Sequence, residues 1–390
     1  MEFNTIIGQA ARKEDFFPRP QIQSEIWKKL KPGSSLLFVG PRRVGKSSIL
    51  FNLLDEPKEK HIIIYYTSES VNNENEFYRK LFNHIVERLN TFKKYQKKLT
   101  TLGKTFLKSI ESIGKDGIKF QHNNSISYYN EVMALVRNLD LGEDRMIVLI
   151  DEFAQTIENI MRDENDDNAI HFLETNREIR QRPEIHKKLQ FIYTGSIGLE
   201  NIVERINGIN FINDLHPISI PPLSRKEAEG LTDKIIRGSE VTFADGAFEH
   251  LLNLIEWWIP FYFQIILDEV PKILVANNST VITKDDIDTA VKNALKLRIY
   301  FEHWFTRLRN AFKGNNFSFV KEVLNIISEK KRFSSSGIVD LAIKHKLEDS
   351  YNNLINTLKY DGYINNEDDP KTYRFNSPLL REWWNRNVAN

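Results

Sequence analysis

Cysteine is absent from the 390 residues of this chain. Its absence excludes disulfide bonds, thiolate metal sites and cysteine nucleophiles, and it fits a reducing compartment. No apolar stretch approaches the roughly 20 residues that span a bilayer, so no membrane partner is expected. An excess of one charge is also missing, because 54 Lys and Arg residues face 53 Asp and Glu residues. Bulk charge therefore favours neither a nucleic acid nor a membrane surface, and any basic surface must be local.

The start of the chain lacks the features of a secretory signal. Met1–Asn4 contains no basic residue followed by an apolar run. Without a secretory signal or a membrane-spanning stretch, the expected protein is soluble and cytoplasmic. Internal repeats and low-complexity tracts are missing as well. Its length and its 41% hydrophobic residues predict two or three domains with a substantial core.

Apolar segments that alternate with helical patterns predict the fold class. The expected strands are Ser34–Val39, His61–Thr67, Met146–Ile150, Leu189–Thr194 and Ile218–Ile220. Continuous runs of β-branched and aromatic residues are typical of strands buried on both faces of a parallel sheet. Helices between such strands imply right-handed βαβ units. The sequence therefore predicts an α/β fold with a doubly wound parallel sheet.

The pattern changes twice along the chain. Residues 1–222 form the predicted α/β core, and residues 91–125 look like a basic, partly helical insertion within it. Residues 223–298 carry only helical patterns and are expected to form a compact helical domain. Ser224 and Glu227 are expected to form a capping box, and a further helix is predicted over Phe261–Leu274. Residues 299–390 combine three helices with a β-hairpin, which is the winged-helix pattern.

A phosphate-binding loop follows the first predicted strand. The eight residues Gly40, Pro41, Arg42, Arg43, Val44, Gly45, Lys46 and Ser47 match G-x-x-x-x-G-K-[ST] in full. The glycines let backbone N–H groups point at phosphate oxygens, Lys46 brings positive charge to the β- and γ-phosphates, and Ser47 can ligate Mg²⁺. The alternative is a glycine-rich turn with an incidental Lys-Ser pair. The strand before the motif and the helix after it favour binding of a purine nucleoside triphosphate with Mg²⁺.

Two acids end the third predicted strand. Asp151 is suited to holding Mg²⁺ through water, and Glu152 is suited to polarising the attacking water. Adjacent carboxylates at the end of a buried strand are costly without a nearby cation. The alternative is a solvated Asp-Glu turn, which the neighbouring phosphate loop makes less favoured.

Polar residues also end the next strand. Its carboxyl end should face the same crevice, where a hydroxyl can orient the water and sense the γ-phosphate. Ser196 is the favoured residue and Thr194 is the second. Ordinary turn chemistry remains an alternative for both.

Several motifs together resemble one known family. They are Phe16-Phe-Pro-Arg19, the loop through Ser48, Leu149–Phe153, Tyr193–Leu199, Ile259–Tyr262 and Arg381–Trp384. The chain resembles the archaeal-type P-loop ATPases, which are related to the AAA+ and STAND proteins and carry a C-terminal winged helix. The similarity extends over most of the chain and is weakest at 91–125.

The resemblance implies a function and further site residues. It implies ATP and Mg²⁺ as cofactors, a helical lid, and nucleotide-controlled switching or assembly. It places Phe17 and Arg19 near the adenine, and it adds Ser48 and Pro260 to the nucleotide site.

The sequence departs from the family pattern at three places. Pro18 precedes Arg19 where the family usually has glycine, and Trp258 stands where the lid motif usually has glycine. Asn213 and Asp214 stand where some relatives carry an arginine. The arginine finger is therefore not assigned, and the candidates are Arg177, Arg180 and Arg205.

The predicted winged helix suggests DNA as a partner. Its recognition helix, Asp349–Tyr360, offers asparagines that can pair with adenine. The wing carries Glu367, Asp368 and Asp369, and these acids would repel phosphates, whereas Lys330–Arg332 would compensate in part. DNA contact, protein docking and a purely structural role all stay open for this domain.

The basic insertion leaves two interpretations open. The lysines of 91–125 form either a solvated helix face or a surface for an anionic partner such as nucleic acid. Taken together, the sequence predicts an ATPase whose cycle drives a switch in partner binding or homo-oligomer assembly. The alternative is an adaptor that holds ATP without hydrolysing it and docks DNA or protein through the winged helix.

Overall fold

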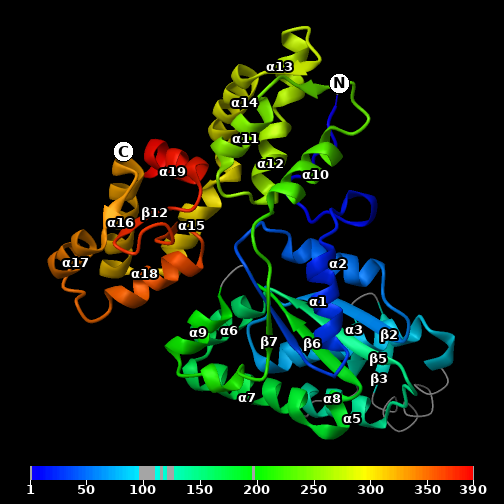
Figure 1. Cartoon of the computed structure of the whole chain (residues 1–390). Coiled ribbons are helices and arrows are strands. Elements are labelled where there is room, and N and C mark those ends of the chain that lie inside the picture. Colours follow the sequence, from blue (N-terminus) through cyan, green and yellow to red (C-terminus); the bar gives the residue numbers. More distant parts are fainter. Residues whose placement is uncertain (1, 96–109, 115–116, 121–126, 196–197, 390) are drawn as a thin grey trace. The chain divides into compact units, whose positions relative to one another are not determined.

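The computed structural model describes residues 2–95, 110–114, 117–120, 127–195 and 198–389 (Figure 1). The chain divides into two compact units. One contains Arg12–Gly40 and Lys46–Ile220. The other contains Met1–Ala11, Pro41–Gly45 and Pro221–Asn390.

A five-stranded parallel sheet forms the centre of the first unit. In spatial order its strands are β2 (His61–Thr67), β5 (Arg145–Asp151), β6 (Leu189–Tyr193), β1 (Leu36–Val39) and β7 (His216–Ser219). Every neighbouring pair is parallel. The five predicted strands and the α/β fold class are thus confirmed, with ends that differ by up to two residues.

Helices cover both faces of this sheet. One face is packed by α1 (Pro20–Leu30) and α2 (Lys46–Asp55). The other is packed by α3 (Glu74–Asn90), α5 (Tyr128–Asn138), α6 (Phe153–Asp163), α7 (Asp166–Gln181), α8 (Pro183–His186) and α9 (Leu199–Arg205). Side chains alternate between the faces along each strand. The sheet is therefore doubly wound.

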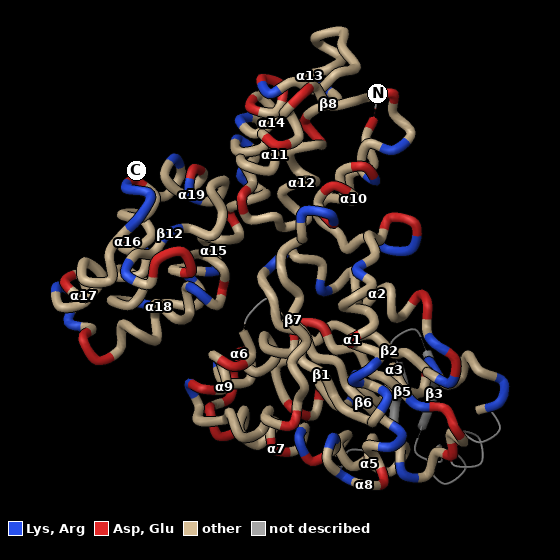
Figure 2. The backbone as a smooth tube through the Cα atoms, in the orientation of Figure 1, with Lys and Arg blue, Asp and Glu red and all other residues tan. Residues whose placement is uncertain are grey.

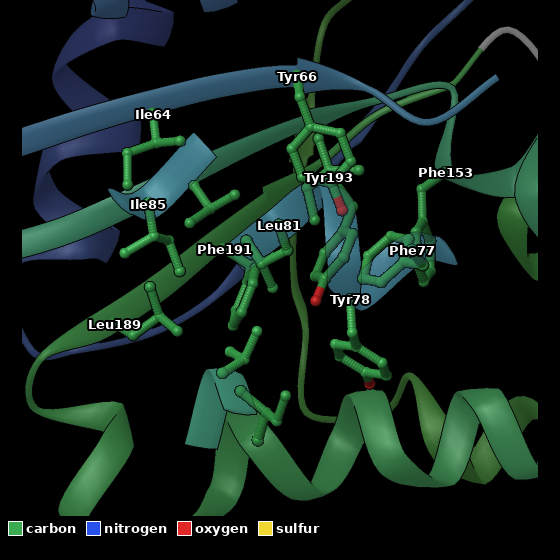
Figure 3. Close-up of a cluster of buried hydrophobic side chains, with 14 of the residues drawn as sticks. Ile64, Tyr66, Phe77, Tyr78, Leu81, Ile85, Phe153, Leu189, Phe191 and Tyr193 are labelled. Atoms are coloured by element: carbon green, nitrogen blue, oxygen red, sulfur yellow. The ribbon is translucent and has the colours of Figure 1, made fainter. Parts of the chain in front are cut away.

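The largest core cluster lies between the sheet and the α3 side. Tyr66, Phe191 and Tyr193 from the strands meet Phe77 and Leu81 from α3 in this cluster (Figure 3). All five side chains are at most 3% exposed. Because this packing fixes the strands against one another, it also fixes the edge at which their carboxyl ends meet.

The region from 91 to 125 contains an element that the sequence did not predict. Strands β3 (Ile110–Gly114) and β4 (Gly117–Phe120) form an antiparallel pair. Residues 96–109, 115–116 and 121–126 lie outside the described residues, and so does most of the predicted basic surface. Lys94 is described, and it forms an ion pair with Asp144.

From Pro221 onward, the second unit first contains a group of short helices. They are α10 (Arg225–Ile236), α11 (Ala247–Ile255), α12 (Pro260–Leu267), α13 (Val270–Ala276) and α14 (Lys284–Lys296). Ser224 and Glu227 form the predicted capping box at α10. The helix predicted over Phe261–Leu274 is divided into α12 and α13, because Pro271 in the first turn of α13 lacks the N–H that would continue α12. Two-residue strands β8 (Thr242–Phe243) and β9 (Val281–Ile282) pair in parallel and were not predicted.

The rest of this unit combines helices with a small sheet. Its helical segments are η4 (Arg298–Tyr300), α15 (Glu302–Ala311), α16 (Gly314–Lys330), α17 (Ser335–Lys344), α18 (Tyr351–Tyr360), α19 (Pro378–Trp384) and η5 (Asn385–Ala389). The antiparallel sheet has the order β10 (Phe333–Ser334), β12 (Thr372–Phe375), β11 (Ile364–Asn365). The three helices and the hairpin match the predicted elements, and β10 is an additional strand. Trp383 and Trp384 of α19 are fully buried in the core of this part of the unit.

Charges of both signs are interspersed along both units (Figure 2). This distribution matches the near-zero net charge of +1. Among the described helices, none combines the length and the apolar character needed to cross a membrane.

Candidate nucleotide site

The register of the sheet brings three strand ends together. Ile150 pairs with Tyr193, so Asp151 and Thr194 follow at neighbouring positions. Strand β1 lies next to β6 and ends at Val39, directly before Gly40. The carboxyl ends of parallel strands share one edge, and ligands of open α/β sheets bind at that edge.

Two glycines of the loop are required for different reasons. A Cβ atom on Gly40 would lie 2.3 Å from the carbonyl oxygen of Ile220, so no larger residue fits there. Gly45 has φ +101°, and no atom lies within 4 Å of its would-be Cβ. Gly45 therefore gives the loop a backbone conformation that other residues rarely adopt, with open space beside it.

Lys46 is the first residue of α2 and closes the loop on itself. Its Nζ donates a hydrogen bond to the carbonyl oxygen of Gly40 at 2.8 Å, and the residue is only 8% exposed. The ammonium group is thus held at the first residue of the loop. The N-terminus of the ten-residue helix α2 adds the positive end of its dipole at the same place.

Ser47 and Asp151 are joined directly. Ser47 Oγ donates a hydrogen bond to Asp151 Oδ2 at 2.7 Å, and Asp151 is 7% exposed. Burial raises the pKa of Asp151, the hydrogen bond from Ser47 lowers it, and the charge of Glu152 raises it further. A cation beside this carboxylate would favour its ionised form.

The donor set at this position fits Mg²⁺. It consists of a hydroxyl and a carboxylate oxygen, the hard ligands that Mg²⁺ prefers. In the described part of the chain, no group of three or more His, Cys, Asp or Glu side chains could hold a metal. Mg²⁺ commonly takes one or two carboxylates and completes its shell with water and substrate phosphates.

Glu152 occupies an unusual backbone position. Its φ of 59° and ψ of 34° are left-handed, and it is the residue before α6. Its N–H donates to Asp151 Oδ1 at 3.1 Å. A non-glycine residue in this conformation is uncommon, and such positions cluster at functional sites.

Of the two hydroxyl candidates after β6, the structure describes one. Ser196 lies outside the described residues. Thr194 is 2% exposed, and its Oγ1 has no hydrogen-bond partner among the described residues. A buried hydroxyl without a partner beside Asp151 is available to a ligand or a water molecule.

The residues predicted to contact the adenine belong to different units. Phe17 is partly buried and Arg19 is 5% exposed, directly before α1. Pro260 is the first residue of α12 in the second unit. Their contacts with a nucleotide stay predictions.

One candidate for the arginine finger has a different role. The Arg180 side chain is 2% exposed and makes two 2.7 Å hydrogen bonds with the carboxylate of Asp214. It also donates to the Phe211 carbonyl and to Asn176. Arg180 is therefore a buried structural residue and was wrongly considered as a finger. Arg205, at the end of α9, is 52% exposed and lies 3.3 Å from Glu158.

Two residues of this site were missed in the sequence. Tyr65 Oη lies 3.4 Å from Asp151 Oδ2, and Ser68 Oγ donates to the Asp151 carbonyl at 3.1 Å. Burial and the neighbouring Asp151 raise the pKa of Tyr65, so its phenol stays protonated. The available signal was their place at the end of β2, which pairs with β5 up to Thr67 and Asp151.

Known proteins resemble this chain in sequence over one segment and in fold throughout. Residues 30–203 match the sequence model of the family described as AAA domain. None of the curated proteins matches the chain.

Two solved structures share the fold over nearly the whole length. The Walker-type ATPase PABY2304 of Pyrococcus abyssi has a TM-score of 0.64 and 18% identity, covering 97% of this chain and 98% of its own. The ORC2 protein of Aeropyrum pernix, solved as ADPNP–ADP complexes, has a TM-score of 0.60 and 11% identity, covering 97% and 95%. At these identities the likeness establishes the fold alone. Residues 30–203 thus resemble the AAA domain in sequence, and the whole chain shares its fold with these two structures.

Proposed function

We propose that this protein is a Mg²⁺-dependent ATPase that couples its nucleotide state to partner binding or assembly. The observation that carries the proposal is the 2.7 Å hydrogen bond between Ser47 and Asp151, with Lys46 folded over the same loop. Mg²⁺, when bound, would neutralise phosphate charge and orient the terminal phosphate. The ADPNP–ADP complexes of the Aeropyrum pernix protein support the choice of nucleotide.

Each residue has a defined role in this proposal. The loop Gly40–Ser48 surrounds the phosphates, and Lys46 moves from the Gly40 carbonyl to the β- and γ-phosphates. Ser47 and Asp151 hold the metal. Glu152 accepts a proton from the attacking water, and Thr194 or Ser196 orients that water. Phe17, Arg19 and Pro260 contact the adenine end of ATP.

Assembly is part of the proposal because the sequence does not assign an arginine finger. An arginine from another subunit commonly stabilises the transition state of phosphoryl transfer. Arg205 is the exposed candidate, whereas Arg180 is held by Asp214. A homo-oligomer that supplies Arg205 from a neighbouring copy fits the proposed switch. We also propose a STAND-type nucleotide cycle. In this proposal residues 223–298 form the lid and residues 299–390 form a winged helix.

The test is the rate of phosphate release with Mg²⁺ and ATP. The wild type should turn over, whereas Lys46→Ala should lose nucleotide binding. Glu152→Gln should bind ATP and lose about 10²–10⁴-fold in rate, as expected for a missing general base. Equal rates for the three proteins, over a range of protein concentrations that allows assembly, would overturn the proposal.

A second candidate function is a docking adaptor that holds ATP without hydrolysis. It is favoured by the exposed face of α18, where Asn352, Asn353 and Asn356 point to solvent. The acids of the wing are partly neutralised within the unit, because Asp368 pairs with Arg374 at 2.8 Å and with Arg332 at 3.6 Å. DNA binding that weakens steeply with salt, and that persists in Glu152→Gln, would favour this function.

A further inference from the structure

Arg43, inside the phosphate loop, makes contacts that nucleotide binding alone does not require. Its guanidinium Cζ lies 3.6 Å from the centre of the Phe261 ring at the start of α12. Its Nη2 lies 3.2 Å from Nδ1 of His303 on α15. All three residues belong to the same compact unit. One loop side chain therefore contacts both helical parts of that unit.

The guanidinium of Arg43 lacks a counter-ion. No carboxylate of the described residues forms an ion pair with it, and its one hydrogen-bond partner there is a neutral ring. Burial and the charge of Arg42 lower the pKa of Arg43 to about 10. A partly desolvated cation without an anion is costly, and an anion nearby would relieve that cost.

The imidazole ring of His303 can accept a hydrogen bond from Arg43. Burial and the charges of Arg43, Arg42 and Arg307 lower the pKa of His303 to about 2, so the ring is neutral. Its Nε2 is buried without a hydrogen-bond partner in the described part of the chain. Because Nδ1 accepts from Arg43, the ring proton belongs on Nε2, and this tautomer is set by the Arg43 contact.

The backbone at Arg43 is held in an uncommon conformation. Its φ is +62°, the left-handed region that non-glycine residues rarely occupy. Such a conformation persists only where surrounding contacts fix it. The contacts with Phe261 and His303 hold the Arg43 side chain in place at this position of the loop.

We infer that Arg43 transmits the occupancy of the phosphate loop to α12 and α15. The inference rests on the proposed nucleotide binding at Gly40–Ser47. Phosphates in the loop supply the missing anionic charge, so they strengthen the contacts of Arg43 with Phe261 and His303. Coupling is reciprocal, so an intact Arg43–His303 contact also strengthens nucleotide binding.

The test combines two measurements on the full chain with Mg²⁺ and a slowly hydrolysed ATP analogue. Fluorescent-nucleotide titration reports binding. Hydrogen exchange of the α15 amides reports coupling. In the wild type, the nucleotide should slow exchange in α15 by about fivefold or more, the lower range of typical allosteric couplings. Arg43→Gln should bind nucleotide more weakly by a similar factor and should show no such slowing.

Matched variants keep the test independent of a folding defect. His303→Ala should weaken both binding and coupling, whereas His303→Asn should restore them, because its amide oxygen can accept near the position of Nδ1. Arg309→Gln is the control, because Arg309 is an exposed arginine of the same helix. It should behave as the wild type.

Two results would contradict these statements in different ways. If Arg43→Gln and His303→Ala bind nucleotide and slow α15 as the wild type does, Arg43 does not transmit occupancy. If the wild type itself binds no nucleotide, the proposed function fails, and the inference that rests on it fails too.

Discussion

Ser47 and Asp151 are 104 positions apart in the sequence, yet their side chains share a hydrogen bond of 2.7 Å. One residue belongs to α2, which follows β1, and the other ends β5. Strand β6 lies between these two strands in the sheet. The contact therefore depends on the order of the strands in the sheet, because Ser47, which follows β1, meets Asp151 beyond the end of the intervening strand β6.

Removal of the Ser47 hydroxyl should alter metal dependence more than nucleotide affinity. Ser47→Ala takes away one of two protein oxygens proposed for Mg²⁺. We expect the Mg²⁺ concentration for half-maximal phosphate release to rise about tenfold or more. Ser47→Thr, which keeps a hydroxyl at the same position, is the control. An unchanged Mg²⁺ titration for Ser47→Ala would show that the serine does not hold the metal.

Thr194 offers a test of water orientation without a cost in stability. Thr194→Val replaces an unpaired buried hydroxyl with a methyl group, so the free energy of unfolding should not fall. If the hydroxyl orients the attacking water, kcat should drop by on the order of 10²-fold at unchanged nucleotide affinity. Ser196→Ala is the companion variant. A drop in Ser196→Ala alone would assign the role to Ser196.

Arg180 and Asp214 should contribute to stability and not to catalysis in trans. Asp214→Ala leaves a buried guanidinium without its carboxylate, and we expect a loss of about 3–5 kcal/mol in the free energy of unfolding. Urea denaturation measures it. Arg205→Ala, on the surface, should cost less than about 1 kcal/mol and should lower phosphate release instead. A stable Asp214→Ala protein would contradict the structural role of this pair.

The lowered pKa of His303 predicts how the free energy of unfolding depends on pH. Its pKa is lowered to about 2 in the folded chain, against about 6.5 when unfolded. The folded chain keeps this ring neutral, whereas the unfolded chain binds a proton below about pH 6.5. The stability present above pH 6.5 is therefore lost as the pH falls. Between pH 7 and pH 5 the unfolded state gains a proton that the folded state does not, which costs up to ~2 kcal/mol.

Urea denaturation at the two pH values checks this, with His303→Asn as the variant without a titrating ring. Other groups titrate in both proteins, so the difference between them isolates His303. If wild type and variant lose the same stability between pH 7 and pH 5, the ring is not held neutral.

The sheet could be predicted from the sequence because its strands are buried on both faces. The run of β-branched and aromatic residues at His61–Thr67 gave the ends of β2 correctly. The two-residue pair β8 and β9 could not be predicted, because strands of that length have no recognisable periodicity. The division of Phe261–Leu274 was missed although Pro271 was visible, since the apolar pattern continues across it.

The loop and both acids could be predicted because each motif is local. Tyr65 could not be assigned, because its position depends on the register between β2 and β5. The role of Arg180 was also hidden, since its partner Asp214 lies 34 positions away. The contacts of Arg43 with Phe261 and His303 join residues more than 200 positions apart, and no local pattern announces them.

The most direct test of the central claim identifies the nucleotide that remains on the protein. Wild type, Glu152→Gln and Lys46→Ala are mixed with labelled ATP and Mg²⁺, separated from free nucleotide, and denatured. Our account predicts ADP on the wild type, ATP on Glu152→Gln, and neither on Lys46→Ala. Intact ATP on the wild type as well as on Glu152→Gln would contradict hydrolysis and favour the adaptor.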